Sequence, residues 1–146
     1  MTDVYRTLGT TVRLLRSRLD RALQTVGLRI GQFQVLRLLW EQDGLTPREL
    51  SERLGVEMPT VTRTVQRMLR DGLVRREAHP ADARSVCIFL EPRGVELQAA
   101  VSTILNTETE ASLAGFTRAD RDALVAYLDR MAANSHAPGG LRASEE

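Results

Sequence analysis

Apolar residues recur along most of the chain at the three- and four-residue spacing of an amphipathic helix. The first stripe consists of Val4, Leu8, Val12, Leu15, Leu19, Ala22 and Val26. It ends at Gly27, a residue type that commonly terminates helices. The second stripe predicts a helix from Ile30 to Glu41. Its inward positions are Phe33, Leu36, Leu39 and Trp40.

Two shorter helices follow and meet at a tight turn. The segment Thr46–Glu49 has the residues of a helix start: a hydroxyl for the cap, a proline for the first helical position and a glutamate for a capping box. This helix stops at Gly55, and the next runs from Pro59 to about Asp71. Two helices joined by a tight turn that contains glycine predict a helix-turn-helix motif.

The hydrophobic period then changes from helix to strand. Leu73–Ala78 and Ser85–Leu90 are predicted strands, and the second alternates apolar residues between its two faces. The segment between them, His79–Arg84, is polar and holds one proline. We therefore expect a β-hairpin with a long tip, or wing.

Helical spacing returns after the hairpin. Pro92 starts a long helix that Gly115 breaks, and a last helix runs from about Arg118 to Ala133. Residues 134–146 are rich in small and polar residues and are predicted to be a disordered tail. The chain is thus expected to be mainly α with a small β-hairpin, a winged helix-turn-helix with N- and C-terminal dimerisation helices.

The apolar stripes at the two ends predict a partner. We assign 31–91 to a winged helix-turn-helix DNA-binding domain, and 1–30 with 92–133 to a helical dimerisation region. The small central core cannot cover every terminal stripe, whereas a second copy of the chain can. A closed bundle within one chain is the alternative. Two-fold symmetry would place two recognition helices about 34–36 Å apart, one turn of DNA.

Charge is distributed unevenly although the net charge is only +1. Residues 58–86 hold six arginines against three acids, and residues 107–146 hold seven acids against four arginines. All 20 basic residues are arginine, whose planar fork suits phosphates and guanine edges. A GC-rich genome is the alternative cause of this bias.

The sequence lacks the residues that several classes of function need. One cysteine, Cys87, and two histidines provide no zinc spacing, so we expect no metal and no cofactor. Neither a glycine-rich phosphate loop nor a nucleophile elbow is present, so we expect no enzyme. The absence of a signal-peptide core or a long apolar run predicts a cytoplasmic protein without a membrane partner.

The helix from Pro59 to Asp71 is the candidate for reading double-stranded DNA. Its apolar residues fall in one sector of about 100°, and hydroxyl, amide and guanidinium groups lie opposite. The opposite residues are Thr60, Thr62, Arg63, Gln66, Arg67 and Arg70. Such groups recognise guanine, adenine, thymine methyls and phosphates in a major groove. A solvated arginine face, with or without ion pairs, is the alternative.

The predicted wing adds further candidates. Arg84 lies near its tip and can enter a minor groove, where negative potential is concentrated. Asp82 is placed to hold that guanidinium extended; an ordinary hairpin ion pair is the alternative. Arg75 and Arg76 are candidate phosphate contacts, or else part of a solvated strand face.

The motifs of this central region resemble those of the MarR (multiple antibiotic resistance regulator) family. They are Met58–Arg63, Asp71–Arg76, Asp82–Val86, Leu90 and Gly94, of which Gly-Leu-Val-x-Arg followed by Asp-x-Arg is the specific part. The resemblance spans about residues 5–133, and it departs at Glu91-Pro92, where the family commonly has threonine. It implies a dimeric regulator of pseudo-palindromic operators, with Pro59–Asp71 as recognition helix and Arg84 in the minor groove.

Such proteins usually repress, and many release DNA when a small aromatic or phenolic ligand binds. The candidate effector residues are Arg16, Leu19, Leu36 and Trp40, for which an ordinary core role is the alternative. We therefore predict a homodimeric repressor released by such a ligand. A constitutive DNA-binding protein and a helical protein-interaction adaptor are the competing hypotheses.

Overall fold

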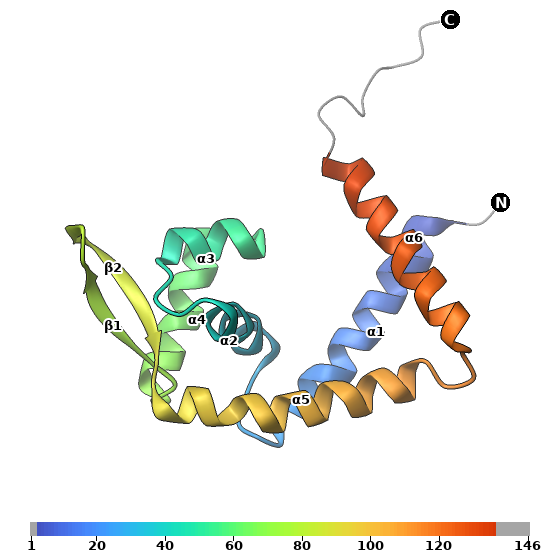
Figure 1. Ribbon diagram of the computed structural model, residues 1–146, viewed down its shortest axis with the longest axis horizontal. Coiled ribbons are helices and arrows are strands. Elements are labelled where there is room, and N and C mark those ends of the chain that lie inside the picture. Colours follow the sequence, from blue (N-terminus) through green and yellow to red (C-terminus); the bar gives the residue numbers. More distant parts are fainter. Residues whose placement is uncertain (1–2, 137–146) are drawn as a thin grey trace, which may run out of the picture. The chain divides into compact units, whose positions relative to one another are not determined.

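Six helices and a two-stranded antiparallel hairpin make up residues 3–136, the part of the chain that the computed structural model describes (Figure 1). The helices are α1 (Val4–Gln24), α2 (Ile30–Glu41), α3 (Pro47–Leu54), α4 (Met58–Arg70), α5 (Pro92–Ser112) and α6 (Arg118–His136). The strands are β1 (Val74–His79) and β2 (Asp82–Leu90). This order confirms the predicted mainly helical fold with a small hairpin.

The chain forms two compact units that divide within α5, between Glu108 and Thr109. The core of the first unit is built from the inward faces of α2, α3 and α4 and from the two strands. Leu23 of α1 and Val101 of α5 are buried in the same core. The central lobe is therefore completed by residues from both helices that we assign to dimerisation.

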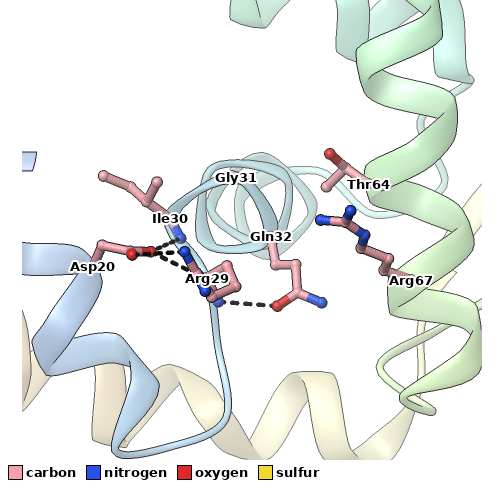
Figure 2. Close-up of a pocket in the computed structure, with 7 residues that line it drawn as sticks. All are labelled: Asp20, Arg29, Ile30, Gly31, Gln32, Thr64 and Arg67. Carbon is pink, nitrogen blue, oxygen red and sulfur yellow. Dashed lines mark hydrogen bonds and ion pairs between the residues drawn. The ribbon is translucent and has the colours of Figure 1, made fainter. Parts of the chain in front are cut away.

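A carboxylate of α1 holds the first turn of α2 (Figure 2). The Asp20 Oδ1 atom accepts a hydrogen bond from the main-chain N–H of Ile30 at 2.9 Å, and the same carboxylate forms an ion pair with Arg29. Burial opposes the charge on Asp20, but these partners outweigh it and lower the pKa of the carboxyl. The connection between α1 and α2 is thus fixed by polar contacts.

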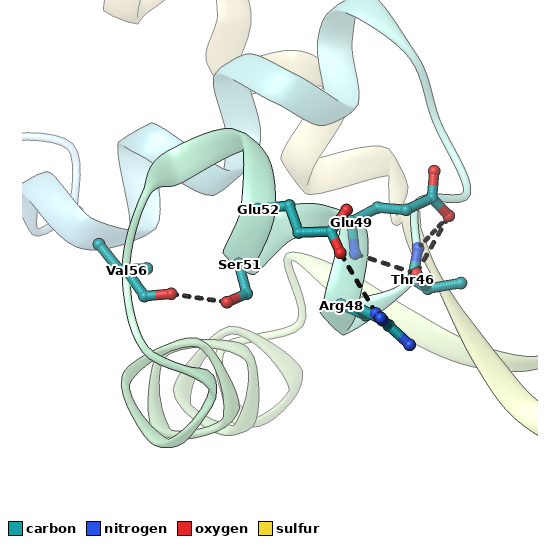
Figure 3. A network of polar contacts seen from close by, with 6 residues as sticks. All are labelled: Thr46, Arg48, Glu49, Ser51, Glu52 and Val56. Atoms are coloured by element: carbon teal, nitrogen blue, oxygen red, sulfur yellow. Dashed lines mark hydrogen bonds and ion pairs between the residues drawn. The ribbon is translucent and has the colours of Figure 1, made fainter. Parts of the chain in front are cut away.

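The helix-turn-helix forms as its local sequence predicts (Figure 3). Thr46 Oγ1 accepts from the N–H of Glu49 at 3.1 Å, and the Glu49 carboxylate accepts from the N–H of Thr46 at 3.3 Å. Gly55 ends α3 in the left-handed conformation, at φ +65°. The Ser51 hydroxyl then donates to the carbonyl of Val56 at 2.6 Å, which closes the turn before α4.

The wing has a shorter tip than predicted. Strand pairing runs from Val74 opposite Leu90 to His79 opposite Asp82, so only Pro80 and Ala81 lie outside the strands. A register shift after Ala78 accommodates the additional residues of β2. The expected loop His79–Arg84 was wrong because His79 pairs with Asp82 and β2 begins there, among polar residues that show no apolar alternation.

The last helix is longer than predicted. It continues past Ala133 to His136, and the Ser135 hydroxyl donates to the carbonyl of Met131 at 2.9 Å. The expected tail therefore does not begin at Asn134, and its remaining residues, 137–146, lie outside the described part. Within residues 3–136, no helix has both the length and the apolar character needed to cross a membrane.

Candidate DNA-binding surface

Helix α4 has one buried face and one face open to solvent. Val61, Val65 and Met68 are buried in the core of the first unit. All six residues predicted on the opposite face are exposed: Thr60, Thr62, Arg63, Gln66, Arg67 and Arg70. The rotation of 100° per residue thus predicted the solvent-facing side of α4 correctly.

The arginines of α4 differ from those of α3 in their partners. On α3, Arg48 forms an ion pair with Glu52, and Arg53 forms one with Glu49. Within residues 3–136, none of the three arginines on the exposed face of α4 has an ion-pair partner. Their positive charge is therefore uncompensated locally and available to an external anion.

Arg84 of the wing is also exposed and, in the described part of the chain, forms no ion pair. The Asp82 carboxylate accepts a hydrogen bond from the main-chain N–H of Arg84 at 3.0 Å and one from the Ser85 hydroxyl at 3.5 Å. Asp82 therefore orders the main chain beside the tip. The expected contact between this carboxylate and the Arg84 guanidinium is not formed.

The two arginines of β1 are in different surroundings. Arg75 Nε donates to Glu77 Oε1 at 2.8 Å, Nη1 donates to the carbonyl of Leu90 at 2.8 Å, and the guanidinium lies 5.3 Å from the ring centre of Phe89. The hydrogen bond with Glu77 is the main cause of its raised pKa. Arg76 is exposed and has no ion pair among residues 3–136. Of the two, Arg76 is the more available to a phosphate.

The four predicted effector residues lie in different surroundings. Leu36 is completely buried, and Trp40 donates from Nε1 to the carbonyl of Gly94 at 2.9 Å. Leu19 is half-buried against the core, whereas Arg16 is exposed on α1. Leu36 and Trp40 thus have the core role that was the alternative at the sequence level.

A pocket of about 280 Å³ lies between α1, α2 and α4 and is lined by none of those four residues (Figure 2). Its lining is Asp20, Arg29, Ile30, Gly31, Gln32, Thr64 and Arg67. Of these, only Arg67 was predicted as a site residue. Gln32 was missed, although a polar residue four positions before Leu36, on the apolar stripe of α2, is a sequence signal for a buried hydrogen bond.

Cys87 is buried in β2, as expected for an inert thiol. Within residues 3–136, no three histidine, cysteine or carboxylate side chains are grouped closely enough to hold a metal ion. The exposed chemistry described above is therefore that of arginine, threonine and glutamine side chains on α4 and the wing.

Comparison with known proteins decides the family. Residues 28–86 match the sequence profile of the MarR family. The uncharacterized HTH-type transcriptional regulator YwoH of Bacillus subtilis (strain 168) is 30% identical over 121 residues, which cover 83% of this chain and 87% of YwoH. The chain belongs to the MarR family. It is a transcriptional regulator of the DNA-binding winged-helix type.

Further comparisons agree with this membership. The HTH-type transcriptional regulator TtmR of Methylorubrum extorquens (strain PA1) is 34% identical over 109 residues, which are 75% of this chain but only 55% of TtmR. A MarR family regulator from Listeria monocytogenes, solved with a 26mer DNA, superimposes with a TM-score of 0.82 at 23% identity. The matched parts are 92% of this chain and 89% of that protein, so the two share the MarR fold.

Proposed function

We propose that this MarR family protein is a homodimeric repressor that inserts α4 into the major groove and the β1–β2 wing into the minor groove of an operator. The observation that carries the proposal is the exposed face of α4, whose three arginines have no ion-pair partner among the described residues. A repressor acts by occupying promoter DNA. A DNA-binding surface is therefore sufficient for this role, and no contact with another protein is needed.

Each exposed group has a role that follows from its chemistry. Arg63 and Gln66 lie near the middle of the open face and are assigned to base edges. Arg67, Arg70, Thr60 and Thr62 surround them and are assigned to phosphates or thymine methyls. Arg76 is assigned to a phosphate of the backbone, and Arg84 to a minor groove.

Exposed apolar side chains support a second copy of the chain as partner. On α1 they are Val4, Tyr5, Val12, Leu14 and Leu15, and on α6 they are Val125, Tyr127, Leu128 and Met131. No residue of α6 is buried. Large apolar side chains left exposed on a helix are characteristic of an interface. The proposal is that a symmetric copy covers both helices.

Release by a small aromatic or phenolic ligand is part of the proposal, and the family resemblance is its support. A constitutive DNA-binding protein is the second candidate, and one observation favours it. Leu36 is fully buried and Trp40 is bonded to Gly94, so two of the four predicted effector residues are already engaged in the core. A thermal-shift screen with aromatic acids separates the candidates: a raised melting temperature supports ligand release.

Salt dependence of binding to random-sequence duplex DNA tests DNA binding itself. Counterion release makes the logarithm of the association constant fall linearly with the logarithm of salt concentration. We expect such a fall, measured by fluorescence anisotropy. A helical interaction adaptor that has kept the fold without DNA binding would give no binding, or a flat response to salt.

A further inference from the structure

Gln32 is the only buried polar residue among those that the structure describes, with 5% of its surface exposed. Both ends of its amide are bonded. Oε1 accepts from the main-chain N–H of Arg29 at 3.0 Å, and Nε2 donates to Oδ2 of Asp71 at 3.1 Å. Asp71 is the C-terminal cap of α4. The start of α2 is thereby tied to the end of the recognition helix.

The polar contacts continue in the other direction to α1. The Asp20 carboxylate bonds the main-chain N–H of Ile30 at 2.9 Å and the guanidinium of Arg29 at 3.2 Å (Figure 2). Asp20, Arg29, Gln32 and Asp71 therefore form one chain of contacts from α1 through α2 to α4. We call these four residues the polar relay.

The polar relay contacts α4 at its C-terminal end. The N-terminal end of α4 follows the helix-turn-helix turn, which the bond from Ser51 to Val56 closes. Along the edge where α4 faces the start of α2, a pocket lies beside Thr64 and Arg67. On that edge, the bond from Gln32 to Asp71 joins the two helices directly.

We propose that Gln32 is a positioning residue for DNA recognition, and that the polar relay fixes the orientation of α4 relative to α1. This inference rests on the proposed function of α4 as the recognition helix. A leucine at this position would suit the apolar stripe of α2 equally well, but it would set no direction. A hydrogen bond to a carboxylate does set one, and base readout requires side chains to be held within about 0.5 Å of their productive places.

A charge exchange between Gln32 and Asp71 tests the proposal. Gln32→Glu places two carboxylates against each other, whereas Gln32→Glu combined with Asp71→Asn restores a bond of the same length with donor and acceptor reversed. Gln34→Glu, on the same helix, is the matched control for the change in charge. Gln32→Leu removes both bonds with a side chain that suits the core, and it is measured as well in case Gln32→Glu does not fold.

Amide hydrogen exchange of residues 67–72, measured without DNA, reports how firmly the C-terminal end of α4 is held. We expect Gln32→Glu and Gln32→Leu to speed this exchange about tenfold, as expected for the loss of a charge-assisted hydrogen bond, with the double variant within about twofold of wild type. Unchanged exchange in Gln32→Leu, or a double variant as fast as Gln32→Glu, would overturn the proposal.

The sequence selectivity of DNA binding reports whether the orientation of α4 matters for recognition. The ratio of the affinity for a selected duplex to that for random duplex is expected to fall about tenfold in Gln32→Glu, to recover in the double variant and to stay unchanged in Gln34→Glu. A ratio that stays at the wild-type value in Gln32→Glu while exchange is faster would overturn the positioning role. Wild-type protein without any selectivity would contradict the proposed function instead, and the exchange data would still decide whether the relay holds α4.

Discussion

The arginines of this chain differ in whether a carboxylate of the chain already neutralises them. Arg48, Arg53 and Arg75 have acidic partners, whereas the arginines on the open face of α4 and Arg84 have none within residues 3–136. An exposed ion pair contributes at most about 1 kcal/mol to stability, so pairing has little value for the fold. Ion pairing matters more for DNA binding, because a guanidinium that is neutralised by a carboxylate attracts phosphate less strongly.

Arg84→Ala is expected to weaken binding to a selected duplex by about tenfold or more, because it removes a cation from the minor groove. The melting temperature should not change, since the side chain is exposed and without an ion pair in the described part. Arg118→Ala, which removes the same charge from the start of α6, is the control and should bind as wild type. Equal affinities of the two variants, measured by anisotropy, would contradict the role of the wing.

Arg63→Ala and Arg76→Ala are expected to have different effects on DNA binding. Loss of a base contact costs about 1–3 kcal/mol and relaxes preference at one base pair, whereas loss of a phosphate contact lowers the salt slope by about one. We therefore expect Arg63→Ala to change the preferred sequence and Arg76→Ala to weaken all sequences alike. In-vitro selection, combined with salt titrations, distinguishes the two. An exchange of these two outcomes would show the assignment to be wrong.

Arg75→Ala is expected to act mainly on stability. Its guanidinium bonds the Leu90 carbonyl and lies over the Phe89 ring, so its loss removes an anchor between β1 and β2. The midpoint of urea denaturation should fall to a lower urea concentration than in wild type. The salt slope of DNA binding should stay closer to wild type than in Arg76→Ala, and the reverse order would show that Arg75 is the phosphate contact.

Predictions of which side chains are exposed succeeded where they depended on one element alone. The open face of α4 follows from a rotation of 100° per residue, whatever surrounds the helix. The partner of Gln32 could not be predicted, because Asp71 lies 39 positions away and only the packing of α2 on α4 brings them together. The same limit applies to Leu36, which is buried in the core, and to Trp40, whose indole N–H donates to the Gly94 carbonyl.

At the scale of elements, the start of α5 is fixed against the loop that follows α4. A Cβ atom added at Gly94 would lie 2.4 Å from the carbonyl oxygen of Leu73, closer than any ordinary contact. The Gly94 carbonyl also accepts from Trp40 of α2, and the N–H of Glu91 donates to the Leu73 carbonyl at 2.9 Å. Glycine at this position therefore allows α5 to approach the DNA-binding lobe.

Gly94→Ala should destabilise the fold by about 1–3 kcal/mol, because the clash is with main chain and one of the two segments must shift. Gly9→Ala is the matched control: nothing lies within 4 Å of its added Cβ, and alanine favours the interior of α1 by up to about 1 kcal/mol. Urea denaturation should therefore move in opposite directions for the two variants. Equal stability of both would contradict the close approach.

Element boundaries were predictable where the local sequence carries a signal. The bounds of α2 were predicted correctly, and so were both ends of α3, where Thr46 caps the start and Gly55 the end. The wing tip and the end of α6 were not, because the pairing of His79 with Asp82 and the continued helix at Asn134 depend on main-chain bonds that polar side chains do not reveal. The register shift after Ala78 has no counterpart in the residue pattern.

At the scale of the whole molecule, the exposed apolar residues of α1 and α6 support the proposed homodimer. We expect the 16.3 kDa chain to sediment at twice its mass at micromolar concentration. Leu15→Asp and Leu128→Asp should each shift the equilibrium toward monomer and weaken operator binding, because both half-sites depend on the pair. A wild-type monomer at these concentrations would contradict the homodimer and leave the assignment of 1–30 and 92–133 to dimerisation without support.

Hydroxyl-radical footprinting of the wild-type protein on the DNA flanking its own gene tests the proposed DNA-binding mode most directly. A symmetric pair of α4 helices predicts two protected regions with their centres about 10 base pairs apart, each flanked by minor-groove protection that Arg84→Ala removes. A single asymmetric protected region, or protection that Arg84→Ala leaves unchanged, would contradict recognition by two copies of α4 and the wing.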